Sequence, residues 1–91
     1  MEAPYIVRVE VISQKGTCSF GHRVGDAAIF DGQDIQGKIC WHALCSMTPK
    51  IHAMLYGAVF PWAKEDPDAI THACPDASNP VVFRLVRSKV G

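Results

Sequence analysis

The feature that most constrains the fold is an alternation of apolar and polar residues near both ends of the chain. It runs through residues 5–12 and returns in residues 81–86. A period of two predicts β-strands, each with one buried face. We expect both strands to lie in one sheet with their apolar faces toward a helical segment, because a shift of one residue would expose those faces. The residues expected to face the helical segment are Tyr5, Val7, Val9, Phe83 and Leu85.

The middle of the chain has a different period. Residues 25–32 predict a short strand bracketed by glycine turns. Apolar residues then recur at helical spacing over residues 39–46. Thr48 is a suitable N-cap, Pro49 suits the first position of a helix, and Gly57 provides a C-terminal stop. We therefore expect two short helices with a break at Thr48, followed by a proline-interrupted segment and an acidic loop.

These elements predict one α+β domain over residues 1–91, a small mostly antiparallel sheet with a short broken helical segment packed on one face. The polar sheet face would carry Arg8, Glu10 and Arg84 as cross-strand partners. Arg84 and the nearby Arg87 and Lys89 form a small basic C-terminal edge, which we interpret as a solvated strand end.

Charge and apolar patterning exclude several classes of partner. Nine basic and nine acidic residues give no net charge, so we expect no nucleic-acid partner, because affinity for phosphate backbones requires a basic surface. The N-terminal segment carries Glu2, Arg8 and Glu10, which do not fit a signal peptide, and no apolar run reaches the length of a membrane span. We expect a cytoplasmic protein without membrane contact. Its cysteines are then thiols or metal ligands rather than disulfides.

The cysteines are Cys18, Cys40, Cys45 and Cys74. We expect Cys18, Cys40 and Cys74 to lie close together, because loops and element ends carry most functional sites. Cys40 is placed at a helix N-terminus, where the helix dipole favours a thiolate. Cys45 lies further into the helix, where a buried thiol that packs as a small hydrophobe is more common.

Several motifs together resemble a family of small uncharacterised bacterial and archaeal proteins over nearly the whole chain. They are Gly16–Cys18, Gly37–Cys40, the segment Phe60–Trp62, the segment Cys74–Asp76 and the strand Pro80–Phe83. The resemblance implies that the three positions of Cys18, Cys40 and Cys74 recur, and that Cys45 has no regular counterpart. Many relatives carry two adjacent cysteines where this chain has only Cys74. No activity accompanies the family, so it implies a three-cysteine constellation without a mechanism.

Three convergent thiols would leave one coordination position for a further ligand. We consider His22 and Cys45, with His22 preferred for a zinc site and Cys45 for an iron–sulfur cluster. Water or a substrate could also take that position. The spacing of the cysteines matches no paired C-x2-C pattern, so the same residues also fit four reduced thiols packed near loops.

We expect a small binding or accessory protein with a cysteine-based metal or iron–sulfur site. One alternative is a thiol-dependent enzyme or redox protein, using Cys74 with His72 and Asp76, or Cys18 with His22; whether the protein is an enzyme stays open. Another is a metal-free interaction module that binds a second copy of the chain or a different protein. Its apolar patch would contain Phe20, Trp41, Phe60 and Trp62.

Overall fold

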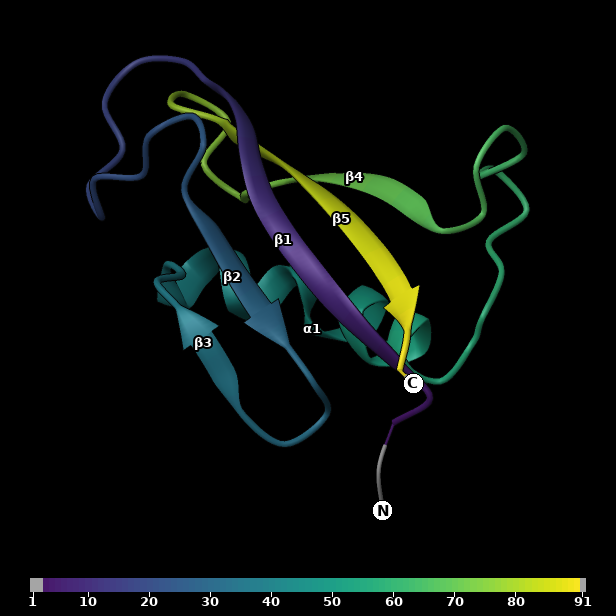
Figure 1. Ribbon diagram of the computed structural model, residues 1–91. Helices are drawn as coiled ribbons and strands as arrows, with labels where there is room; N and C mark the ends of the chain where they lie inside the picture. Colours follow the sequence, from purple (N-terminus) through teal and green to yellow (C-terminus); the bar gives the residue numbers. More distant parts are fainter. Residues whose placement is uncertain (1–2, 91) are drawn as a thin grey trace.

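Two strands from the two ends of the chain form the centre of the sheet. In the computed structural model, which describes residues 3–90, strand β1 (Tyr5–Gln14) pairs antiparallel with β5 (Val81–Lys89). Glu10 lies opposite Arg84, as expected for the polar face. The carboxylate of Glu10, however, forms its ion pair with Arg8 on the same strand. Figure 1 shows these two long strands side by side, with both described chain ends close together.

Three shorter strands complete the sheet, whose order is β3-β2-β1-β5-β4. Strand β2 (Ala27–Phe30) confirms the short strand predicted between the glycine turns. The edge strands β3 (Ile35–Gly37) and β4 (Ala69–Ala73) were not predicted. All neighbouring strands are antiparallel.

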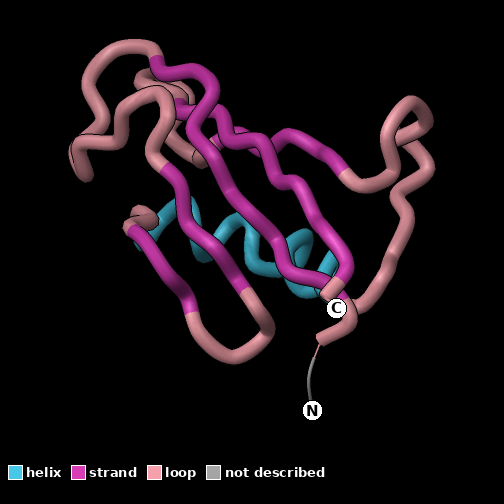
Figure 2. The backbone as a smooth tube through the Cα atoms, in the orientation of Figure 1, coloured by secondary structure: helices cyan, strands magenta, loops and turns pink. Residues whose placement is uncertain are grey.

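Helix α1 (Trp41–Leu55) covers one face of the sheet, as Figure 2 shows. This arrangement confirms the α+β fold. The sheet residues beneath the helix include Val7, Val9, Phe83 and Leu85, all buried as predicted, whereas Tyr5 is partly exposed. The buried face of the helix consists of Ala43, Met47, Ile51, Met54 and Leu55.

The predicted break at Thr48 was wrong, because α1 runs without interruption through Pro49. Proline inside a helix costs about 3 kcal/mol relative to alanine. Burial of Met47, Ile51 and Met54 contributes about 1.5 to 3 kcal/mol each, so packing against the sheet outweighs that cost. Thr48 donates its hydroxyl proton to the carbonyl of Leu44 and so continues the helix instead of capping a new one. The helix does end as predicted before Gly57, whose φ is +89°.

Arg87 is a second correction, because it lies inside the protein rather than at a solvated strand end. The side chain is 3% exposed and its Nε donates to Asp68 Oδ1 at 2.9 Å. The guanidinium also donates to the carbonyls of Ala58 and Met54 and lies 4.7 Å from the ring centroid of Tyr5. Arg87 thus joins β5 to the C-terminal end of α1 and to the loop before β4.

No helix within residues 3–90 has the length and apolarity needed to cross a membrane.

Candidate functional site

Three of the four cysteines line one pocket of about 420 Å³, which we call the thiol pocket. Cys18 comes from the loop between β1 and β2, Cys40 from the start of α1, and Cys74 from the turn between β4 and β5. The two loops lie at the same end of the sheet in Figure 1. This convergence confirms the expected proximity of the three cysteines. The complete lining is Cys18, Ser19, Phe20, Cys40, His42, Cys74, Pro75, Asp76 and Asn79.

Cys40 is the N-cap residue of α1, as predicted. Its backbone is extended, with φ −63° and ψ 136°, and its carbonyl accepts the first helical hydrogen bond from Leu44 N at 2.8 Å. Its side chain does not cap the helix, and no acidic residue occupies the first turn. The positive end of the helix dipole therefore faces a thiol, with no carboxylate in the first turn.

Cys74 is held where β4 meets its turn. Its backbone N–H donates to the Val81 carbonyl at 2.9 Å, and its Sγ accepts a hydrogen bond from Val81 N at 3.2 Å. A backbone N–H directed at sulfur stabilises negative charge on that atom. The sulfur of Cys74 therefore has one backbone N–H donor beside it.

The Asp76 carboxylate shapes the turn after Cys74. It accepts hydrogen bonds from the backbone amides of Ser78 and Asn79, at 3.0 and 3.1 Å. These amides, with Asn79 first, hold the pKa of Asp76 below its ordinary value of 3.8. The contacts make Asp76 an Asx-turn residue and leave it poorly suited to act as a base for Cys74.

His22 and Cys45 do not line the thiol pocket. His22 is 2% exposed, and its Nε2 accepts a hydrogen bond from Cys40 N at 3.0 Å. That nitrogen's lone pair is therefore occupied in this structure. Cys45 is exposed on α1, so the expectation that its thiol is buried in the helix packing was wrong. His42 lines the pocket, although the sequence did not indicate it as a candidate ligand. Its role could have been predicted only by combining its position in the first turn of the helix with the convergence of the two loops.

His72 is engaged with Ser46 rather than with Cys74. Its Nε2 lies 2.9 Å from Ser46 Oγ, and this hydroxyl donates to the Ala43 carbonyl. Ser46 Oγ can then accept a hydrogen bond from a protonated Nε2. Burial, followed by the nearby charge of Lys50, lowers the pKa of His72 below its ordinary value of 6.5. Among the hydrogen bonds of the described residues, none joins Cys74 to the side chain of His72 or Asp76, the two partners expected from the sequence.

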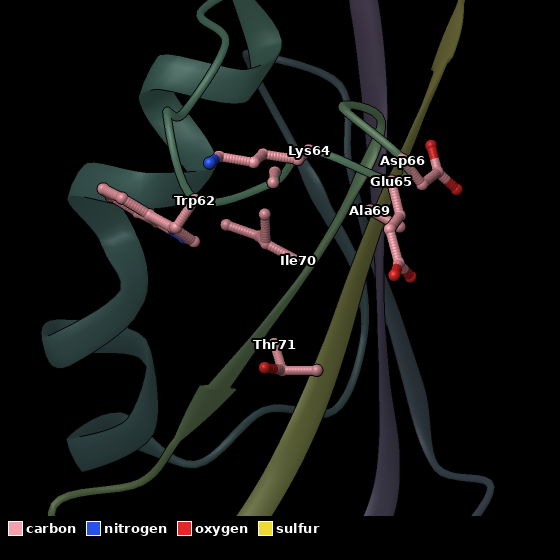
Figure 3. Close-up of a pocket in the computed structure, with 8 residues that line it drawn as sticks. Trp62, Lys64, Glu65, Asp66, Ala69, Ile70 and Thr71 are labelled. Atoms are coloured by element: carbon pink, nitrogen blue, oxygen red, sulfur yellow. The ribbon is translucent and has the colours of Figure 1, made fainter.

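The four residues of the predicted aromatic patch do not line one pocket. Phe20 lines the thiol pocket, and Trp41, the first residue of α1, is exposed outside that lining. Phe60 stacks on Trp62 in the loop after α1, with ring centroids 4.8 Å apart. Trp62, which is 64% exposed, lines another hollow of about 490 Å³ with residues 63–66 and 69–71. Figure 3 shows the carboxylates of Glu65 and Asp66 pointing away from the indole ring, so charged groups do not converge there. Of the two hollows, the thiol pocket has the more convergent chemistry.

Within residues 3–90, no three or more His, Cys, Asp or Glu side chains are arranged to hold a metal ion. The thiols share a pocket without surrounding a single point. No protein-family model, curated protein or solved structure matches the chain.

Proposed function

We propose that this protein is a small cytoplasmic binding or accessory module that holds a thiolate-bound metal centre, an iron–sulfur cluster or zinc, in the thiol pocket. The observation that carries the proposal is the convergence of Cys18, Cys40 and Cys74 from three separate segments. Thiolates are the ligands that both centres prefer. The helix dipole at Cys40 and the amide of Val81 at Cys74 support the thiolate forms.

The pocket has room for a centre larger than a closed zinc site. A structural zinc ion draws four ligands to within about 2.0 to 2.3 Å of itself and leaves no open space. A volume of about 420 Å³ has room for a cluster, or for an ion together with a bound small molecule. The three cysteine side chains would turn toward one another as the centre forms, on segments that stay in place.

The fourth coordination position would fall to His42 or to solvent. His42 lines the pocket, whereas the Nε2 of His22 already accepts the amide of Cys40 and Cys45 lies outside the lining. A centre with three protein thiolates and one exchangeable position could bind a substrate or a partner's ligand.

The test is anaerobic purification followed by iron, sulfide and zinc analysis and a visible spectrum. Equal amounts of iron and acid-labile sulfide with visible absorption would establish a cluster. Stoichiometric zinc without colour would establish the zinc form. A protein without metal, which also fails to take up zinc or to assemble a cluster from ferrous iron and sulfide, would refute the proposal.

Metal-free thiol chemistry is the second candidate, because the dipole at Cys40 and the amide at Cys74 would also activate a nucleophilic thiolate. Alkylation by iodoacetamide, mapped by mass spectrometry at several pH values, tests it. Faster reaction of Cys40 or Cys74 than of the exposed Cys45 near pH 7 would support thiol chemistry. Equal alkylation rates at Cys40, Cys74 and Cys45 would count against thiol chemistry.

A further inference from the structure

Two side chains that are not thiols connect the three segments of the thiol pocket. Each segment carries one cysteine, so the relative positions of the sulfurs depend on what joins the segments. His22 connects the β1–β2 loop to the start of α1, and Asn79 connects the same loop to the β4–β5 turn. Neither link consumes a thiol.

The His22 link is buried and directional. Its Nε2 accepts the Cys40 amide at 3.0 Å, its Nδ1 lies 3.5 Å from Asp26 Oδ2, and Asp26 accepts the Arg23 amide at 3.0 Å. The imidazole packs between Phe20 and Phe83, with ring centroids 4.6 and 5.4 Å away. Because the donor is the backbone of Cys40, the imidazole positions that residue directly. The residues between Cys18 and His22 include a tight turn, in which Gly21 N donates to Cys18 O at 3.0 Å.

The Asn79 link joins the other pair of segments. Its Oδ1 accepts the Thr17 amide at 2.9 Å, next to Cys18, while its own amide and Nδ2 donate to Asp76. The close approach also explains Gly16, where a Cβ would lie 2.2 Å from Asn79 Oδ1 and the backbone has φ +71°. Asn79 thereby joins the Cys18 loop to the Cys74 turn, beside a backbone hydrogen bond from Lys15 N to Pro80 O at 3.0 Å.

We propose that His22 and Asn79 are positioning residues that preorganise Cys18, Cys40 and Cys74 for a thiol-binding ligand before that ligand arrives. The inference rests on the proposed function for the identity of the natural ligand, and it changes the role of His22 from the ligand expected from the sequence to a support for Cys40. Preorganisation matters because a site ordered in advance loses less conformational entropy on binding.

The test uses phenylarsine oxide, which binds a pair of thiols by forming two As–S bonds and releasing one water. Its affinity therefore reports how well two thiols are held together and requires no native metal. We expect His22→Phe to weaken binding roughly tenfold, because it leaves the partly buried Cys40 amide without its acceptor. Asn79→Leu should weaken it roughly threefold, because the Thr17 amide is exposed and water can replace the lost acceptor.

Rescue and control variants separate positioning from a loss of stability. His22→Gln keeps an acceptor of similar reach and should recover most of the affinity. Asp31→Ala is the matched control, because it also removes a side-chain acceptor of backbone amides. Asp31 Oδ1 accepts the amides of Gln33 and Asp34 at 2.8 Å, in the turn between β2 and β3, away from the thiols. It should leave the arsenical affinity unchanged. Circular dichroism and urea unfolding establish that each variant is folded.

The inference would be overturned if folded Asn79→Leu and His22→Phe bound phenylarsine oxide as tightly as the wild type. It would also be overturned if Asp31→Ala weakened the binding as much as they do. If His22→Phe does not fold, the affinities of Asn79→Leu and His22→Gln for phenylarsine oxide decide whether the inference holds. A wild-type protein that binds the arsenical tightly but never takes up metal would refute the proposed function and leave this inference standing. A wild-type protein that does not bind it would refute the inference even if metal analysis succeeds.

Discussion

Cys40 and Cys45 are separated by only a few residues, yet they occupy different environments. Cys40 is the N-cap residue of α1 and lines the thiol pocket, while Cys45 is exposed outside the lining. We predict that Cys40→Ser lowers the metal content of anaerobically purified protein severalfold, whereas Cys45→Ser leaves it within error. Serine preserves the size of the side chain and removes most of its affinity for soft metals. A larger loss in Cys45→Ser would show that the roles are reversed.

Arg87 is the residue whose replacement should cost the most stability outside the apolar core. We predict that Arg87→Met lowers the free energy of unfolding by about 2 to 3 kcal/mol, because it removes charged hydrogen bonds to Asp68 and to the carbonyl of Ala58. Urea unfolding measures the change. Arg84→Met on the exposed face is the matched control and should stay within about 0.5 kcal/mol. Similar losses in both variants would contradict the role given to Arg87.

At the scale of elements, Pro49 tests whether packing or propensity maintains α1. The residue is exposed, and it cannot donate to the carbonyl of Cys45 one turn earlier. We predict that Pro49→Ala raises the free energy of unfolding by about 1 to 2 kcal/mol, since the restored hydrogen bond exceeds the entropy that proline removes from the unfolded chain. Urea unfolding again provides the measurement. A less stable variant would mean that the helix depends on its proline.

The elements that the sequence predicts are those with a clear period. The alternation in residues 5–12 and 81–86 identified the central strands and their buried face, and Gly57 correctly marked the end of the helix. The edge strands were missed because β3 has only three residues, all exposed, and β4 mixes small and polar side chains. A local signal at Thr48 and Pro49 was misleading, because the sheet beneath the helix supplied the larger energy.

Part of the site could be predicted, and part depends on contacts that no local pattern encodes. Convergence of the three cysteines follows from their places at the ends of elements. The burial of His22 does not, because its partner is the backbone amide of Cys40, eighteen residues away in the chain. Arg87 is hidden in the same way, since its acceptors lie on the helix end and in a loop.

At the scale of the whole molecule, four turns contain an aspartate whose carboxylate accepts backbone amides: Asp26, Asp31, Asp66 and Asp76. Asp26, Asp31 and Asp76 all have a pKa below the ordinary value of 3.8, chiefly because of these hydrogen bonds. In acid the unfolded chain therefore binds protons more readily than the folded protein does. We predict that their contribution to stability is present above pH 3.8 and is lost as the pH falls through the lowered values.

The urea midpoint measured as a function of pH checks this prediction on metal-free protein. Asp31→Asn is the informative variant, because asparagine can keep the turn and does not titrate. Its midpoint should fall less steeply with acid than that of the wild type. An unchanged acid slope would contradict the assignment of Asp31 to this loss.

The pairing of β1 with β5 has a consequence for how the chain folds during translation. Strand β1 is synthesised before its central neighbour, residues 81–89, which follows several seconds later at roughly 5 to 20 residues per second. Until then the buried valines of β1 have only β2 and part of α1 to cover them. The sheet can therefore close only after translation has passed β5, and until then the apolar face of β1 lacks its central neighbour.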